Sequence, residues 1–331
     1  WGRNNGSGAF TILNNVASGE GDFLQGVETA RFTPGDPLEV ALSWHESGRG
    51  IQFLTVPENP STTAWSWRRV STTSLDEQIT AVDLETNGTM DLILGTQWLR
   101  FDGATWTAHV LNPASGLPDR NRVADINRDG KIDVVVGFES ASAPSKLAWY
   151  EQPSSPGSTW PERVISSTVI APMSLDVADM DHDGDFDVVV GEHNLNNPAN
   201  ARLLIFENSI GDGSQWVVHT VFTGDEHHDG AIVVDMDNDG DLDIISIGWN
   251  HPRVLWYENR AIVKAQQPVP VQLVDFRGER TARGVQLRWT TLSEMNNFGF
   301  FVQRRRADSP TFSDRPNSFV PGHGTTLEPH H

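Results

Sequence analysis

The chain has 331 residues and a formal charge of −20 at pH 7. This charge excludes the basic surface that nucleic acids and anionic membranes attract, so we expect no nucleic-acid partner. The absence of cysteine excludes disulfide bonds and thiol chemistry, and without an apolar run of about 18 residues we expect no membrane insertion.

The first residues already match a pattern that returns later in the chain. Trp1-Gly-Arg-Asn-Asn5 is similar to Trp149-Tyr-Glu-Gln152 and to Trp256-Tyr-Glu-Asn259. We therefore expect the sequence to begin in the middle of a repeat. Frequent glycine and proline, together with 12 tryptophans, favour short strands joined by turns.

An acidic turn recurs four times, starting at residues 83, 125, 179 and 235. The clearest copy is Asp179-Met-Asp181-His-Asp183-Gly184-Asp185-Phe-Asp187. Carboxylates this close repel one another unless a cation lies among them. A hard divalent ion takes oxygen ligands at alternate loop positions, and a glycine lets the chain turn sharply around it.

Four short strands accompany each acidic turn. An apolar strand precedes the turn, a second strand follows it, a third carries aromatic residues, and a fourth begins with Trp or Phe, as in Trp216-Val-Val-His-Thr-Val221. The turns start 42, 54 and 56 residues apart. Four strands at this period are typical of a β-propeller blade, and blades bury their faces by stacking.

The number of blades stays open in the sequence. Residues 27–70 keep the rhythm, but around Gly35 the ligand positions hold Ala30, Phe32, Pro34 and Leu38, so we expect this blade to be ion-free. The last repeat lacks a fourth strand. Either Phe10–Leu13 closes that sheet to give a five-bladed ring, or the chain is a piece of a larger ring of about seven blades.

The composition changes after Pro268, where the acidic turns stop and basic residues become denser. Segments 271–276, 285–289 and 298–303 alternate like strands. The predicted fold is all-β: a propeller of four-stranded blades, five or more, and a second, smaller and incomplete β-sandwich. The predicted boundaries are 1–262 for the propeller, 263–270 for a linker and 271–331 for the truncated module.

Two families resemble this pattern. The acidic turns in register, with strands such as Val188-Val-Val-Gly191, resemble FG-GAP or VCBS repeats, shared with integrin α-subunit heads and secreted bacterial proteins. Segments 270–276, 289–300 and 319–326 are similar to the fibronectin type III-like module that precedes the sorting domain of type IX-secreted bacterial proteins. The resemblance implies an exported bacterial protein, extracellular or on the cell surface.

The FG-GAP resemblance places Ca²⁺ in the turn between first and second strands. Side chains at positions one, three, five and nine and the carbonyl at seven are the implied ligands. About three sites follow, with the 83 turn as a fourth candidate: Asp125, Asn127, Asp129 and Asp133; Asp179, Asp181, Asp183 and Asp187; Asp235, Asp237, Asp239 and Asp243; and Asp83, Glu85, Asn87 and Asp91.

Two other interpretations of these turns exist. An EF-hand needs Glu at position twelve. The 125, 179 and 235 turns hold Val136, Val190 and Ser246 there, so an EF-hand is excluded. A plain Asp/Gly turn without an ion stays open, most of all at the 83 turn, because Glu85 is longer than the usual ligand.

The face opposite the acidic turns gathers aromatic, histidine and carboxylate residues. One hypothesis is a binding module for glycans or extracellular proteins, with ligand-binding residues Trp44, His45, Trp98, Glu192 and Trp249. The alternative is a polysaccharide lyase or other carbohydrate-active enzyme, with His193, His227, His228 or His251 as base or Zn²⁺ ligand.

A purely structural role for these residues is the third interpretation, because Trp at a strand end often packs against its neighbours. The two tyrosines, Tyr150 and Tyr257, lie inside third strands, which disfavours tyrosine acid–base chemistry. The sequence leaves the ligand and the oligomeric state open.

Overall fold

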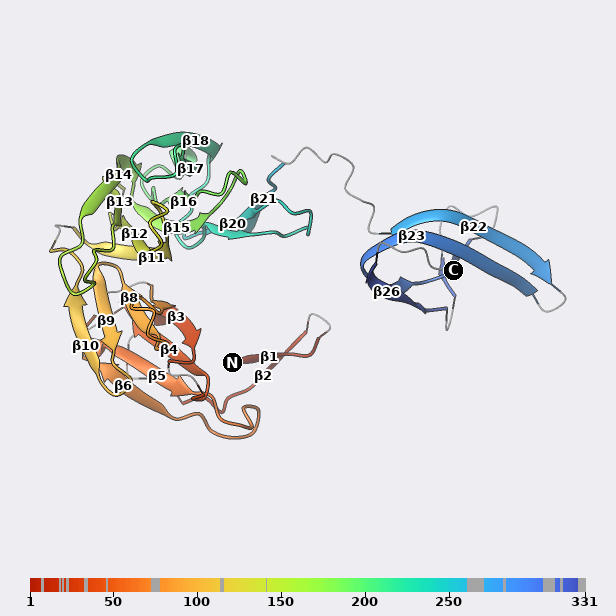
Figure 1. The fold of residues 1–331 in the computed structure, drawn as a ribbon, viewed down its shortest axis with the longest axis horizontal. Coiled ribbons are helices and arrows are strands. Elements are labelled where there is room, and N and C mark those ends of the chain that lie inside the picture. Colours follow the sequence, from red (N-terminus) through yellow and green to blue (C-terminus); the bar gives the residue numbers. More distant parts are fainter. Residues whose placement is uncertain are drawn as a thin grey trace. The chain divides into compact units, whose positions relative to one another are not determined.

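The computed structural model describes residues 1–6, 9–17, 19, 21, 24–32, 35–45, 47–72, 78–113, 116–140, 142–260, 271–281, 284–305, 313–315 and 318–326. The chain divides into two compact units, Trp1–Ala261 and Ile262–His331 (Figure 1). The predicted linker, 263–270, lies outside the described residues. Within the described ranges, no helix has the length and hydrophobicity needed to cross a bilayer.

The first unit is a β-propeller of five blades built from antiparallel sheets. In each blade the strands are hydrogen-bonded in chain order. Blade 1 consists of β3 (Leu24–Ala30), β4 (Glu39–Trp44), β5 (Ile51–Thr55) and β6 (Trp67–Ser71). Blade 2 consists of β7 (Thr80–Val82), β8 (Asp91–Leu94), β9 (Gln97–Phe101) and β10 (Trp106–Val110).

Blades 3 and 4 are longer and are also four-stranded. Blade 3 consists of β11 (Pro118–Ala124), β12 (Asp133–Phe138), β13 (Pro144–Tyr150) and β14 (Glu162–Ile170). Blade 4 consists of β15 (Pro172–Ala178), β16 (Asp187–Glu192), β17 (Arg202–Asn208) and β18 (Trp216–Thr223). The two short 3₁₀ helices, η1 (Ser47–Arg49) and η2 (Pro198–Asn200), lie in the loops between second and third strands.

Blade 5 has three strands among the described residues: β19 (Ile232–Val234), β20 (Asp243–Gly248) and β21 (His251–Tyr257). Phe10–Leu13 does not complete this sheet as one of the two sequence hypotheses required. Instead β2 (Phe10–Ile12) pairs with β1 (Gly2–Asn4) in an antiparallel hairpin. A tight local pairing needs only a short loop, whereas closing blade 5 would join the two ends of the unit.

The stacking of blades explains the apolar runs in the second strands. β12 and β16 are buried along their whole length. Because side chains alternate between the two faces of a strand, Val134 and Val136 pack with blade 2 while Val135 packs with blade 4. In the same way Val189 packs with blade 5, while Val188 and Val190 pack with blade 3. Four hydrophobic clusters thus fill the four contacts between consecutive blades.

In blade 1, two of the positions that hold ligands in the acidic turns are occupied by core residues. Ala30 and Phe32 belong to the cluster shared with blade 2, and Phe32 stacks on Phe53 with ring centroids 4.5 Å apart. Gly35 still has a positive φ of 89°. Gly35 thus shares the left-handed conformation of the turn glycines, while Ala30 and Phe32 contribute hydrophobic packing.

The second unit is a small all-β structure. β22 (Val271–Thr281), β23 (Gly284–Phe300) and β26 (Val320–Thr326) form one sheet, and β24 (Gln303–Arg304) pairs with β25 (Ser313–Asp314). The predicted strands at 285–289 and 298–303 merge in the long β23, apart from the residues beyond Phe300. The fibronectin-like β-sandwich stays a prediction.

Removing a core side chain between blades should be costly. Leu204 is 1 % exposed in the cluster between blades 3 and 4, so Leu204→Ala should lower the free energy of unfolding by about 2–5 kcal/mol. Leu117→Ala is the matched control, because Leu117 is 65 % exposed and should change stability by no more than about 0.5 kcal/mol. Urea unfolding followed by tryptophan fluorescence measures both, and equal effects would contradict the stacking of blades through this cluster.

Candidate metal centres

The four acidic turns share one backbone conformation. The residue at position four is left-handed in each: Thr86 (φ 51°), Arg128 (58°), His182 (62°) and Asn238 (58°). The glycine at position six is left-handed as well: Gly88 (φ 86°), Gly130 (84°), Gly184 (90°) and Gly240 (96°). Left-handed residues other than glycine persist only where their surroundings enforce them, and they cluster at ligand-binding loops. The 83 turn therefore has the same fold as the other three.

The aspartate at position one fixes this conformation. One of its carboxylate oxygens accepts a hydrogen bond from the glycine N–H at position six, at 2.8 Å in the 83 and 125 turns, 3.0 Å in the 179 turn and 3.1 Å in the 235 turn. The second carboxylate oxygen, Oδ1, also accepts the N–H of position five in three turns. In the 179 turn that N–H instead binds Asp181.

The aspartate at position nine ties the turn to its sheet. Asp133, Asp187 and Asp243 are almost completely buried at the start of the second strand. One oxygen of each accepts the N–H of position two, at 3.0, 3.0 and 3.1 Å. The other accepts an N–H at or just after the end of the third strand, at 2.9, 2.9 and 2.8 Å. These carboxylates brace the turn as well as adding negative charge to it.

Two of the turns bring three carboxylates together. Asp179, Asp181 and Asp187 form one triad and Asp235, Asp237 and Asp239 the other, with one oxygen from each residue within 4.8 Å of the others. Ligand oxygens on opposite sides of Ca²⁺, each about 2.3–2.6 Å from it, are separated by a similar distance. Asp179 Oδ1 is buried and has no hydrogen-bond partner within the described part of the chain. The donor set and this unpaired oxygen fit a hard cation.

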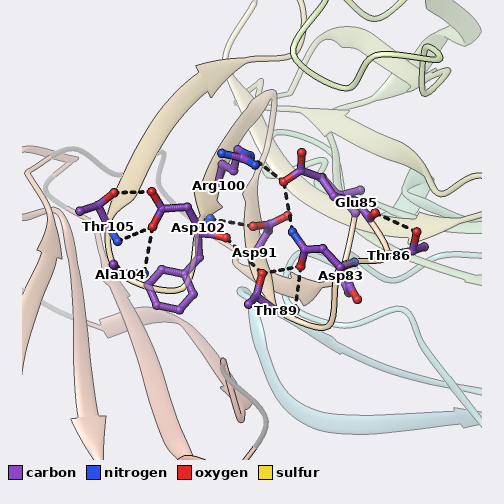
Figure 2. Close-up of polar contacts among 12 residues, drawn as sticks. Asp83, Glu85, Thr86, Thr89, Asp91, Arg100, Asp102, Ala104 and Thr105 are labelled. Atoms are coloured by element: carbon purple, nitrogen blue, oxygen red, sulfur yellow. Dashed lines mark hydrogen bonds and ion pairs between the residues drawn. The ribbon is translucent and has the colours of Figure 1, made fainter.

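The 83 and 125 turns contain protein cations instead of a close triad. Arg100 Nε lies 2.6 Å from Glu85 Oε2, and Asp91 Oδ1 accepts the N–H of Phe101 at 2.7 Å (Figure 2). In the 125 turn Asn127 is uncharged and Lys131 pairs with Asp129. Each of these turns therefore has part of its negative charge neutralised by the chain itself.

Burial and mutual repulsion raise the pKa values of two position-nine aspartates, Asp133 and Asp187. Burial, opposed by the backbone hydrogen bonds and aided by the neighbouring carboxylates, raises the pKa of Asp133 to about 7 and that of Asp187 to about 6. A carboxyl whose pKa is higher in the folded than in the unfolded state loses its stabilising contribution as the pH rises through the folded value. A bound cation offsets this loss near neutral pH.

The sequence interpretation missed a set of amides that join consecutive blades. A residue at or just after the end of the third strand donates its side-chain N–H to the carbonyl at position two of the acidic turn in the preceding blade: Gln152 to Leu84 (2.9 Å), Asn208 to Ile126 (2.9 Å) and Asn259 to Met180 (3.2 Å). We call these residues the latch amides. Their signal was already present in the recurring Tyr-Glu-Gln152 and Tyr-Glu-Asn259.

A second link between turns uses positions four and seven. Arg128 contacts Asp185 of the next turn and donates to the carbonyl of Asp183 at 3.3 Å. His182 Nε2 lies 3.9 Å from Asp241 Oδ1 in the turn after that. Asp185 and Asp241 are buried, and the alternating pattern alone gave no reason to assign them a role between blades.

The opposite face, which we call the mouth face, brings several of the predicted residues together. It contains the loops at the N-terminal ends of the first strands. His193 Nδ1 lies 2.6 Å from Glu226 Oε1, and His228 Nδ1 lies 2.6 Å from Asp229 Oδ1. The rings of His193 and His228 are 4.2 Å apart, and the ring of His228 is 5.4 Å from that of Trp249.

The other two predicted histidines are held inside the fold. His227 is fully buried, its Nδ1 lies 2.7 Å from Ser246 Oγ, and burial lowers its pKa to about 4. His251 Nε2 lies 3.2 Å from the carbonyl of Glu226, while its Nδ1 accepts the N–H of Arg253 at 3.4 Å. Neither imidazole has the freedom expected of a base in an open site.

The predicted ligand-binding residues differ in their access to solvent. Trp98 is 1 % exposed and its ring packs 4.9 Å from His109, and Trp44 is also buried, so neither presents a ring face to a sugar. Glu192 is buried and accepts hydrogen bonds from Arg202 and from the backbone of Ile170. His45 is exposed, and Trp249 is 65 % exposed.

With this geometry in place, comparison with known families gives a match. Residues 125–190, from the 125 turn to the second strand of blade 4, match the profile of the FG-GAP-like repeat. This chain is a propeller with an FG-GAP-like repeat. No curated protein matches the chain significantly.

Solved structures match this chain at low similarity. The complex of BBS1N with ARL6DN matches at 11 % identity and a TM-score of 0.43, covering 95 % of this chain and 84 % of that one. An exo-β-1,3-galactanase from Phanerochaete chrysosporium matches at 12 % and 0.36, covering 88 % and 71 %. The V. cholerae biofilm matrix protein Bap1 matches at 12 % and 0.36, covering 93 % and 52 %. With TM-scores below 0.5, these structures indicate neither ligand nor reaction for this propeller.

Loss of a latch amide should loosen two blades at once. Asn208→Ala removes the hydrogen bond to Ile126 and the one that Asn208 Oδ1 accepts from the Gly213 N–H, and both pairs are buried. Leaving these groups unpaired should cost about 1–3 kcal/mol in thermal or urea unfolding. The control is Asn196→Ala at an exposed position. An Asn208→Ala protein as stable as the control would contradict the linking role.

The raised aspartate pKa values predict that cation binding releases protons. At pH 6 Asp133 is largely protonated in the ion-free protein and must lose its proton as Ca²⁺ binds, whereas at pH 8.5 it is already ionised. Calorimetric titrations in two buffers of different ionisation enthalpy should show buffer-dependent heats at pH 6 and nearly equal heats at pH 8.5. If the heats measured in the two buffers were equal at pH 6 as well, no proton would be coupled to binding.

Proposed function

We propose that this protein is a calcium-stabilised propeller that acts outside the cell as a binding module, holding glycan or protein ligands on its mouth face. The observation that carries the calcium part is the pair of aspartate triads in turns of identical conformation. The supporting chemistry is an all-oxygen donor set with an unpaired, buried Asp179 Oδ1.

The two triads are the strongest candidate sites, and the other two turns are weaker ones. Asp179, Asp181, Asp183 and Asp187 would hold one ion, and Asp235, Asp237, Asp239 and Asp243 another. The 125 turn has one carboxylate fewer, and in the 83 turn Arg100 already neutralises Glu85. We therefore propose two stronger calcium sites, at the 179 and 235 turns, and a weaker one at the 125 turn. A fourth site, at the 83 turn, fills last.

An extracellular or cell-surface location is part of this proposal, and the ion chemistry is compatible with it. Calcium sites in extracellular modules bind with dissociation constants of about 10⁻⁴–10⁻³ M, so they are filled where calcium is abundant. The fibronectin type III-like resemblance of residues 271–331 would fit export from a bacterial cell. That assignment and the type IX route remain part of the proposal.

The binding hypothesis is better supported than the lyase alternative. The imidazoles of His193 and His227 are buried, and burial raises the pKa of both tyrosines, to about 12 for Tyr257. Tyr150 donates its hydroxyl to Glu162 at 2.7 Å. Burial thus disfavours these histidines and tyrosines as the base of a lyase, whereas an exposed Trp249 suits ligand binding.

Calcium should raise the melting temperature, and each triad should contribute separately. At a free concentration 100 times its dissociation constant, one ion adds about 2.7 kcal/mol. The double variants Asp179→Asn/Asp181→Asn and Asp235→Asn/Asp237→Asn should each lose one bound ion in calorimetric titration and part of the thermal shift. Asp212→Asn, at an exposed position, is the control. A melting temperature that calcium leaves unchanged would overturn the proposal.

Binding itself is tested with the calcium-loaded protein on arrays of extracellular glycans and matrix proteins. The proposal predicts binding that weakens when EGTA removes calcium, because loosened turns no longer hold the blades in place. Binding to neither kind of ligand, in a protein with a normal calcium-dependent melting temperature, would contradict the binding role and leave the ion sites intact.

A further inference from the structure

The mouth face contains a cavity of about 360 Å³. It is lined by the N-terminal parts of β3, β11 and β15 and by the residues that precede β7 and β19. All five blades therefore contribute, at the ends of the first strands that lie opposite the acidic turns. Its volume lies at the lower end of the range of small-molecule sites, about 300–1,000 Å³.

The charged residues of the cavity are already paired within the protein. Arg120 lies 2.9 Å from Asp119 and 3.5 Å from Asp229, and Arg122 lies 2.7 Å from Asp176. Asp229 in turn binds His228. A charged ligand would have to separate one of these ion pairs, whereas a neutral polar ligand leaves them in place.

The cavity contains two hydrogen-bond acceptors, the uncharged amide oxygen of Gln25 and the carboxylate of Asp229, which its neighbours hold in place. Gln25 Oε1 is buried without a hydrogen-bond partner among the described residues. Asp229 contacts both His228 and Arg120 through its Oδ1 atom. Although burial opposes it, the hydrogen bond and charge of His228, with Arg120, hold the pKa of Asp229 below its ordinary value, so the carboxylate stays an acceptor.

An exposed aromatic residue lies beside His228, the residue that contacts Asp229 of the cavity lining. His228, fixed by Asp229, packs edge-on against Trp249, whose ring is 65 % exposed. Fixed acceptors next to an exposed indole are the combination that recognises a sugar, because hydroxyl groups meet the acceptors while C–H groups lie on the ring face.

We propose that this cavity binds an uncharged saccharide unit, with Gln25 and Asp229 accepting hydrogen bonds from its hydroxyls and Trp249 stacking on its ring. This inference rests on the proposed binding function and names its ligand class and site. Arg120 positions Asp229 and does not pair with an acidic sugar.

The test uses the full chain loaded with calcium and two oligosaccharide panels, one neutral and one of uronates, in calorimetric titrations. A neutral oligosaccharide should bind. Trp249→Ala should weaken its binding about tenfold and Gln25→Ala several-fold, with unchanged melting temperatures. Trp256→Ala, at a half-exposed tryptophan on β21, and Gln215→Ala, at an exposed glutamine, are the matched controls and should bind normally.

Three results would overturn the inference. Preference for uronates would assign Arg120 or Arg122 to the ligand. Glycan binding that survives both Trp249→Ala and Gln25→Ala would place the site elsewhere on a functioning binding module. Binding of extracellular proteins but of no saccharide would retain the proposed function and refute this ligand class.

Discussion

Repulsion among carboxylates is the constraint on which this structure depends. Each turn concentrates acidic residues where the first strand of a blade gives way to the second. In the 125, 179 and 235 turns the aspartate at position nine is buried, and both of its oxygens accept backbone N–H groups. The turn is thus firmly folded and yet electrostatically unfavourable without a positive charge. The chain meets this demand in different ways: with Arg100 in the 83 turn, with Lys131 in the 125 turn, and with sites that fit a divalent ion in the 179 and 235 turns.

The turns are also joined to one another. Latch amides and the contacts of Arg128 and His182 connect each turn to the next along one face of the propeller. The hydrophobic clusters between blades complete the same connections in the interior. Stabilising one turn therefore also restrains the position of the adjacent blade, while the mouth face, formed at the other ends of the same strands, keeps its loops available for a ligand.

Local sequence patterns were sufficient to predict the repeated elements. Alternating aspartates around Gly184 and Gly240 predicted the turns, and the valine run after Asp187 predicted a fully buried strand. Long-range outcomes were not predictable in this way. The pairing of Phe10–Ile12 with Gly2–Asn4 depends on which strand edge lies nearby, and the burial of Trp98 depends on the next blade covering it. Arg100 meets Glu85 across a hairpin, which spacing along a single strand does not reveal.

The latch amides have a consequence for how this fold can be divided. Asn208 lies in blade 4 but saturates the carbonyl of Ile126 in blade 3, and Gln152 and Asn259 act in the same direction. The unit to exchange in recombination or domain grafting therefore does not coincide with one sheet. It combines the acidic turn of one blade with the third strand of the next blade. A graft whose ends coincide with the boundaries of one sheet would break these hydrogen bonds on both sides. A graft that includes an acidic turn together with the third strand of the next blade would keep them.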